Sequence, residues 1–128
     1  MGIGNRIALG LLGSPVHRIL SGAVMGLEFE GRRSGHAVRL PVQYAGDRDR
    51  LVVCASNPAS KTWWRNFERP RPATVTLAGR RVAMVGTAVQ YPVPDDPDVA
   101  TYRERYPKVA DIPLLVVFTP ADAPAPSA

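Results

Sequence analysis

The stretch Val38-Arg39-Leu40-Pro41-Val42-Gln43-Tyr44 decides the fold class of this chain. Its apolar residues occupy every second position, which is the period of a β-strand that buries one face. A second alternating stretch runs from Val24 to Phe29, and a glycine-containing loop over 31–35 joins the two. Since proline cannot donate to a ladder of backbone hydrogen bonds, Pro41 places its strand at an edge or a bulge of the sheet.

Four further segments have the composition of strands. The apolar run Leu51–Ala55 follows a polar turn over 46–49, and we expect it to form a meander with the first two strands. A hairpin is expected between Val75–Leu77 and Val82–Val89, across a turn that contains Gly79. The last buried strand is expected over Leu114–Phe118.

Two short helices complete the expected elements. Ser60 is a suitable N-cap for a helix of about two turns that reaches Phe67, because Pro70 forbids its continuation. A second helix is expected over Pro97–Tyr106. About six antiparallel strands without βαβ alternation favour a mainly β (α+β) fold. The architecture that we expect is a split antiparallel β-barrel with short peripheral helices.

The length and charge of the chain limit its organisation and its partners. At 128 residues it forms one domain with a core of its own. We expect an amphipathic helical segment over 1–22, the barrel domain over 23–119 and a disordered Ala/Pro tail over 120–128. With 16 Lys and Arg against 11 Asp and Glu, the net charge is +5 and the pI is near 10.0. This balance favours anionic partners.

Two features of the chain bear on its location. Cys54 is the single cysteine and lies in an apolar run, so we expect it to be a core residue. We also expect the protein to occupy a reducing compartment. The apolar run Ile7–Leu12 is too short for a signal peptide or a membrane span, so we expect a cytoplasmic protein. The amphipathic residues within 3–20 would either pack on the barrel or touch an acidic membrane surface as a peripheral contact.

Two segments carry the candidate site. The loop Gly31-Arg32-Arg33-Ser34-Gly35 places two guanidiniums and a hydroxyl on glycine-permitted backbone, which suits a phosphate or a carboxylate. The segment 61–67 adds the Lys61 ammonium, two indoles and the Asn66 amide, which suit a flat polar ring beside that anion. Together they predict a site for an anionic, aromatic cofactor.

Several short motifs also follow one another in a specific order. They are Asn5-Arg6, Ser14-Pro15-Val16-His17-Arg18, Gly31-Arg32-Arg33-Ser34-Gly35, Arg39-Leu40-Pro41-Val42, Ala55-Ser56-Asn57, Lys61, Trp63-Trp64-Arg65-Asn66-Phe67 and Ile112-Pro113. Their order and spacing resemble those of the deazaflavin-dependent nitroreductase and quinone reductase family, in the split β-barrel flavin-binding superfamily. The resemblance implies an oxidoreductase in which reduced coenzyme F-420, an 8-hydroxy-5-deazaflavin, gives a hydride to a quinone, a nitroaromatic or another unsaturated hydrophobic acceptor. FMN is the alternative cofactor.

The resemblance also implies roles for particular residues. The loop 32–34 would hold the phosphate and acidic tail of the cofactor, while 39–42 and 55–57 would run along its ring. Lys61 would meet the charge of the tail, Trp63 would form a wall of the pocket, and Asn66 would fix the helix or bond to the cofactor. The full cofactor-binding set is Arg32, Arg33, Ser34, Gly35, Arg39, Pro41, Val42, Ala55, Ser56, Asn57, Lys61, Trp63 and Asn66.

Tyr102 and Tyr106 are the candidate catalytic residues. They are four positions apart on an expected helix, so both hydroxyls could face an acceptor and donate a proton to it. Packing of the helix on the barrel is the alternative role for both. No metal site is expected, because His17 and His36 are far apart in the sequence and lack carboxylate or cysteine neighbours.

Other function classes remain open at this stage. A split barrel could bind a flavin, a haem or a lipid without turnover, and the sequence leaves monomer and homodimer open. Nucleic-acid binding is suggested by the pI and by two tryptophans among basic residues, but no recognisable RNA- or DNA-binding module is present. We therefore expect small-molecule partners and no nucleic acid.

Overall fold

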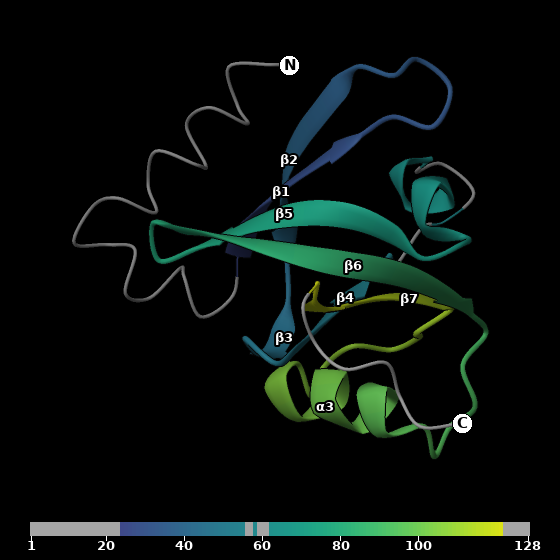
Figure 1. Ribbon diagram of the computed structural model, residues 1–128. Coiled ribbons are helices and arrows are strands. Elements are labelled where there is room, and N and C mark those ends of the chain that lie inside the picture. The colour runs from purple at the N-terminus through teal and green to yellow at the C-terminus, as the bar shows by residue number, and fades with distance from the viewer. Residues whose placement is uncertain (1–23, 56–57, 59–61, 122–128) are drawn as a thin grey trace.

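The structure is a computed structural model that describes residues 24–55, 58 and 62–121. This part of the chain folds into one curled antiparallel sheet with a 3-10 helix at one side and an α-helix across its outer surface (Figure 1). The elements are β1 (Val24–Glu30), β2 (Ala37–Gln43), β3 (Ala45–Asp47), β4 (Arg50–Cys54), η1 (Trp63–Phe67), β5 (Arg71–Leu77), β6 (Arg80–Gln90), α3 (Pro97–Arg105) and β7 (Leu114–Pro120).

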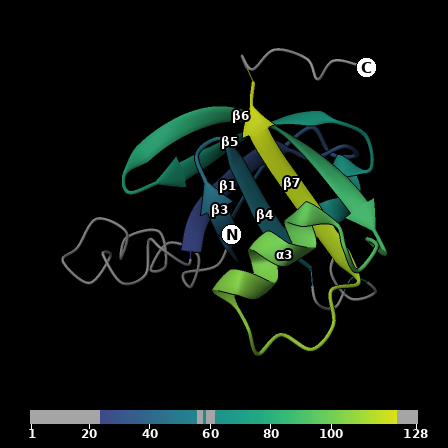
Figure 2. The same cartoon turned by 90° about the horizontal axis from the view of Figure 1, so that it is seen from below.

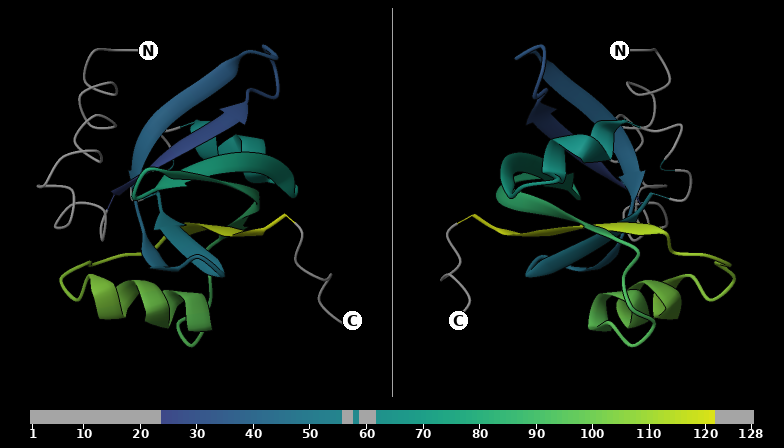
Figure 3. Two further views of the ribbon diagram at one scale, coloured as in Figure 1. Left: turned by 60° about the vertical axis from the view of Figure 1, so that its left-hand side comes forward. Right: turned by 90° about the vertical axis from the view of Figure 1, so that its right-hand side faces the viewer.

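The order of the strands explains why the sheet curls. It is β2-β1-β5-β6-β7-β4-β3, so β2 and β3 form the two edges. Yet β2 ends at Gln43 and β3 begins at Ala45, so a single residue joins opposite edges of the seven-stranded sheet. The sheet therefore has to bend round until its edges approach one another, which Figure 3 shows from two sides. The predicted class of fold, a split antiparallel barrel, is confirmed in this half-barrel.

The predicted meander of the first three strands is wrong. β4 pairs with β3 on one side and with β7 on the other, with Val53 opposite Val116, and it does not pair with β2. The chain turns at Tyr44, and Ala45–Asp47 then pairs with Arg50–Val52. Gly46, which was expected in a turn, lies in this extra strand with φ +95°, and a Cβ there would lie 2.2 Å from the Arg50 carbonyl oxygen. There are thus seven strands in the described chain and not six.

The β5–β6 hairpin is confirmed and is longer than predicted. Its two-residue turn consists of Ala78 and Gly79, with φ values of 48° and 80°. Two successive positive φ values are those of a type I′ turn, whose twist matches that of the flanking strands. The edge position predicted for the strand of Pro41 is also confirmed, because β2 pairs with β1 alone.

The first helix differs from the prediction in type and length. It is the five-residue 3-10 helix η1, preceded by Thr62, and not an α-helix of two turns that begins after Ser60. Ser60 itself lies outside the described residues. In a 3-10 helix, residues three apart lie above one another. Trp64 and Phe67 have this spacing, and both are buried against the sheet.

Aromatic rings fill the concave side of the sheet. The Phe67 ring meets Phe29 at 5.0 Å and Phe118 at 5.3 Å between ring centroids, both edge to face. Gly86 lies beneath these rings. A Cβ at this position would lie 2.6 Å from Cε1 of Phe118 and 2.7 Å from Cδ1 of Phe67. The absence of a side chain at Gly86 therefore lets η1 approach the sheet.

The helix α3 is confirmed over nearly its predicted range and lies across β7 and β4 (Figure 2). Asp96 caps it by accepting the backbone N–H of Asp98. Asp98 is buried and accepts two hydrogen bonds from Arg50 of β4, at 2.7 and 2.8 Å. Such a forked pair fixes the orientation of the helix as well as its position.

The predicted boundaries at the ends of the chain are tested in one place. Pro120 was expected in the tail, but it ends β7, where it is opposite Met84. The expected N-terminal segment 1–22 and residues 122–128 of the expected tail lie outside the described residues. Within the described ranges, no helix is long and apolar enough to cross a membrane.

Candidate functional site

A cavity of about 530 Å³ opens where the barrel is split, between the edge strand β2 and the end of β4. We call it the apolar cavity. η1 and the segment that contains α3 contribute further lining residues. Its lining residues are Leu40, Pro41, Val42, Gln43, Val53, Cys54, Ala55, Trp63, Tyr102, Tyr106 and Val109. Its size lies within the range of small-molecule sites.

The apolar cavity gathers predicted site residues from four separate segments. Pro41 and Val42 come from β2, Ala55 follows β4, Trp63 begins η1, and α3 contributes its two tyrosines. The predicted juxtaposition of these residues is therefore present in the structure. Because β2 is an edge strand, its outer backbone groups are not used in the sheet at this cavity.

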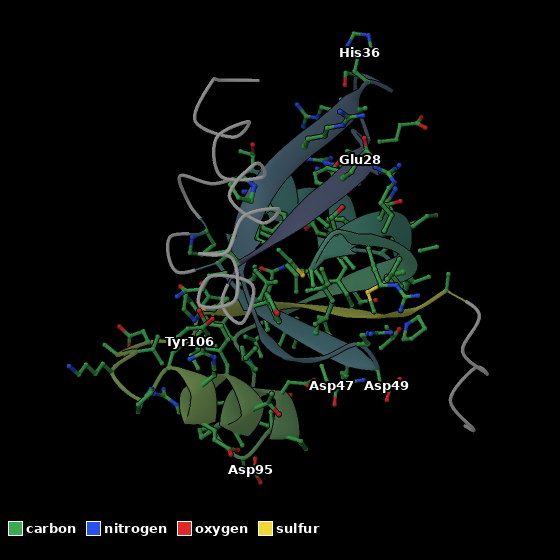
Figure 4. All side chains as sticks on the ribbon, turned by 90° about the vertical axis from the view of Figure 1, so that its left-hand side faces the viewer. Glu28, His36, Asp47, Asp49, Asp95 and Tyr106 are labelled. Atoms are coloured by element: carbon green, nitrogen blue, oxygen red, sulfur yellow. The ribbon has the colours of Figure 1, made fainter. Side chains whose placement is uncertain are left out.

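The two tyrosines have different surroundings. The rings of Tyr102 and Tyr106 are 4.7 Å apart, tilted by 42°. The Tyr106 hydroxyl donates to the backbone carbonyl of Tyr44, and it also interacts with the Gln43 side chain. Figure 4 shows Tyr106 between α3 and the strands. Burial is the main cause of the raised pKa of Tyr106. Tyr106 thus links α3 to the chain between β2 and β3.

Tyr102 is only 5% exposed, and its ring packs in the cluster beneath α3. Within the described residues, the Tyr102 hydroxyl makes no hydrogen bond. Every fully buried side-chain oxygen in this part of the chain has a hydrogen-bond partner. The Tyr102 hydroxyl oxygen is therefore not fully buried, and Tyr102 lines the apolar cavity. Burial, followed by the influence of Cys54 and Tyr106, raises the pKa of Tyr102 to about 12.

A second cavity, of about 480 Å³, lies between the β1–β2 loop and η1. We call it the arginine cavity. Its lining residues are Gly31, Arg32, Arg33, Ser34, Thr62, Arg65 and Asn66. These residues bring three guanidiniums together without a carboxylate among them. A cavity with this lining suits a phosphate or a polycarboxylate, because each guanidinium offers forked donors to such groups.

Hydrogen bonds within the β1–β2 loop define its shape. The Gly31 N–H donates to the His36 carbonyl, and the Gly35 N–H donates to the Gly31 carbonyl, both at 2.9 Å. Ser34 Oγ accepts the His36 N–H at 3.1 Å, which leaves the Ser34 hydroxyl proton available to donate. Gly35 has φ +71° and supports the turn, but it does not line the arginine cavity.

The Asn66 carboxamide connects the loop to η1. Its Oδ1 accepts the backbone N–H of Arg32 at 2.6 Å, and its Nδ2 donates to the Trp63 carbonyl at 2.8 Å. Trp63 lines the apolar cavity, while its neighbours Thr62 and Asn66 line the arginine cavity. The two cavities are therefore adjacent at η1, with the Asn66 amide between them.

Arg39, like Gly35, is a predicted site residue that lines neither cavity. It is paired across strands with Glu28, and its Nε donates to that carboxylate. Glu28 accepts a second bond from Arg81 at 2.8 Å. The guanidiniums of Arg39 and Arg81 hold the pKa of Glu28 below its usual value. Three other predicted residues, Ser56, Asn57 and Lys61, lie outside the described residues.

Several lining residues were not predicted from the sequence, and Arg65 is the charged residue among them. Thr62 and Arg65 are three positions apart, so in a 3-10 helix they lie on one side, and both line the arginine cavity. Arg65 also stacks on the Trp64 ring at 5.0 Å. Leu40, Gln43, Val53, Cys54 and Val109 of the apolar cavity were missed as well.

Comparisons with known proteins support the fold and leave the function open. No family model matches this chain, and no curated protein matches it. A crystal structure of a protein of unknown function from Agrobacterium tumefaciens str. C58 is similar, with a TM-score of 0.52 and 21% identity. The match covers 89% of this chain and 51% of the other, so this chain spans about half of that protein's length. At this identity, the likeness concerns the fold alone.

Proposed function

We propose that this protein is an oxidoreductase that transfers a hydride from reduced coenzyme F-420 to a quinone, a nitroaromatic or another unsaturated hydrophobic acceptor. The observation that carries the proposal is the adjacency of the two cavities at η1. One cavity is lined by three arginines and the other by apolar and aromatic side chains. A ligand with an anionic tail and a flat ring would match both cavities at once.

The residues present fit such a cofactor. Arg32, Arg33 and Arg65 would hold the phosphate and carboxylates of the tail through forked hydrogen bonds. Pro41 and Ala55 have small side chains on the walls of the apolar cavity, which lets a ring approach the backbone there. Trp63 would cover the ring from η1. When bound, the reduced deazaflavin supplies the hydride, so the chain itself needs no nucleophile.

The protein itself would position the acceptor, exclude water from it and donate a proton to it. The apolar lining removes water from the acceptor, which strengthens hydrogen bonds made to it. With its pKa near 12, the Tyr102 hydroxyl stays protonated at neutral pH. It would donate to an acceptor oxygen, and Tyr106 would hold α3 in place through Tyr44. Both tyrosines were expected to be catalytic. We now propose Tyr102 as the proton donor and Tyr106 as the residue that holds α3 in place.

The second candidate function is binding of a flavin, a haem or a lipid without turnover. The engaged hydroxyl of Tyr106 favours it, because one of the two expected proton donors is used by the backbone. Under this alternative, Tyr102 would serve only to orient a ligand.

A titration distinguishes the cofactor classes. Oxidised coenzyme F-420 and FMN are added separately to the purified protein, and the fluorescence of its two tryptophans is followed. We expect tight binding of the deazaflavin and weaker binding of FMN, because the arginine cavity has more guanidiniums than one phosphate requires. Binding of neither compound would contradict the proposed cofactor. Binding of the deazaflavin without reduction of any quinone or nitroaromatic by its reduced form would favour the non-catalytic alternative.

Replacement of the two tyrosines separately tests their assigned roles. Tyr102→Phe should slow acceptor reduction about 10²-fold, the lower end of the range for general acids, with little change in thermal stability. Tyr106→Phe removes the hydrogen bond to Tyr44, so it should lower the free energy of unfolding by about 1 kcal/mol. Turnover and urea denaturation are measured for both variants. Equal turnover in the wild type and Tyr102→Phe would return Tyr102 to a packing role.

A further inference from the structure

The Asn66 side chain is placed to link events in one cavity to the other. Its two hydrogen bonds, to the Arg32 N–H and the Trp63 carbonyl, satisfy the amide within the protein. Among the hydrogen bonds of residues 24–55 and 62–121, the bond from Arg32 to Asn66 is the one that crosses from the β1–β2 loop to η1. The amide therefore fixes the basic loop relative to the wall of the apolar cavity.

We propose that Asn66 is a positioning residue that couples the two cavities, so that an anion in the arginine cavity strengthens binding of an aromatic ring in the apolar cavity. The inference deepens the proposed function and rests on it, since it concerns two parts of one ligand site. It replaces the direct cofactor contact that the sequence suggested for Asn66.

The coupling has an entropic basis: the anion and the ring each order the same two segments, so either one reduces the entropy that the other must lose on binding. An anion held by Arg32 and Arg33 from the loop and by Arg65 from η1 restrains both segments. Through Asn66, the same restraint reaches the Trp63 backbone. A ring that binds beside Trp63 then orders fewer groups than it would without the anion. Because coupling between two sites is reciprocal, the ring must strengthen anion binding by the same factor.

Two small probes test the coupling without the cofactor. Lumiflavin is an uncharged three-ring flavin, and inorganic phosphate is the anion alone. The dissociation constant of lumiflavin is measured by tryptophan fluorescence with and without saturating phosphate, at constant ionic strength. We expect phosphate to strengthen lumiflavin binding about fivefold or more in the wild type. We expect Asn66→Ala to lose most of this strengthening, because the anion then restrains η1 only through the flexible Arg65 side chain.

Arg65→Ala is the matched control, because Arg65 is adjacent in sequence and lines the same cavity without bridging the loop to η1. It should weaken phosphate binding yet keep the strengthening of lumiflavin once phosphate is saturating. Equal coupling in the wild type and Asn66→Ala would overturn the assignment of Asn66. Loss of coupling in Arg65→Ala at saturating phosphate would also overturn it, because the bridge is intact there.

A measurement on the wild type keeps the inference testable if Asn66→Ala does not fold. The chain has two indole N–H groups, so two such signals are expected in a ¹H–¹⁵N NMR spectrum. Phosphate should shift the Trp63 signal although Trp63 lines the other cavity. Binding of both probes with no mutual effect would overturn the coupling alone. Failure of both probes to bind would contradict the proposed function as well.

Discussion

Replacing Arg32 and Arg33 together by alanine should weaken binding of the deazaflavin cofactor about 10²-fold. Each guanidinium lines the arginine cavity, and a hydrogen bond to a charged group contributes about 1.5–3 kcal/mol. Both side chains are exposed, so we take the lower end for each, which gives about 3 kcal/mol in total. Titration of the double variant by tryptophan fluorescence gives the change directly.

The double variant Arg48→Ala/Arg80→Ala is the control. It removes two positive charges at exposed positions, one in the β3–β4 turn and one at the start of β6, that line neither cavity. If the loss of affinity arose from net charge, both double variants would show it and salt would remove the difference. Unchanged cofactor affinity in Arg32→Ala/Arg33→Ala would show that the β1–β2 loop is not part of the binding site. The folded state should persist in both, because the hydrogen bond from residue 32 to Asn66 uses the backbone.

Gly86→Val should destabilise the protein by about 3 kcal/mol or more. The new Cβ alone would lie 2.6–2.9 Å from atoms of Phe118 and Phe67, and both rings are fully buried. The rings cannot move outward, since Phe67 also packs edge to face on Phe29. Overpacking of a filled core costs about 1–3 kcal/mol, and valine adds two methyl groups beyond Cβ. Urea denaturation of the variant measures the loss.

Ala83→Val, on the same strand but exposed, should change stability by less than about 0.5 kcal/mol. Similar unfolding midpoints for the two variants would show that the ring cluster can rearrange around Gly86. Gly86→Val should also weaken cofactor binding. If η1 is forced away from the sheet, both cavities lose a wall, so Gly86→Val should bind the cofactor poorly even where it remains folded.

The local elements could be predicted because their signals lie within short stretches. Alternation over Val38–Tyr44 indicated a strand, Pro41 indicated its place at an edge or a bulge, and apolar runs on either side of Gly79 indicated a hairpin. The pairing of β4 could not be predicted in this way, because its partner β7 lies some sixty residues further along the chain. Nothing in the residues around Tyr44 shows that one strand ends there and another begins. Long-range pairing, and not local propensity, decided the topology.

The candidate site was predictable to a similar extent. Residues grouped in one loop, such as Arg32 and Arg33, were found from the sequence and lie together. Arg39 was grouped with the cofactor-binding residues, but the alternation of β2 places it on the opposite face from Leu40, where Glu28 of β1 accepts its hydrogen bond. Arg65 was not predicted as a site residue, because it meets Arg32 and Arg33 only through the packing of η1 beside the β1–β2 loop, which lies some thirty residues earlier in the chain.

The central position of β7, the last strand of the described residues, governs when the sheet can become complete during synthesis. β7 lies between β6 and β4, so the β3–β4 hairpin joins the rest of the sheet only through β7. Until the ribosome has released residues 114–120, β4 has no partner strand besides β3 and its other backbone edge stays open. The β3–β4 hairpin thus depends on the much later residues of β7 to cover its edge, which favours slow folding and makes chaperone binding to the incomplete sheet advantageous.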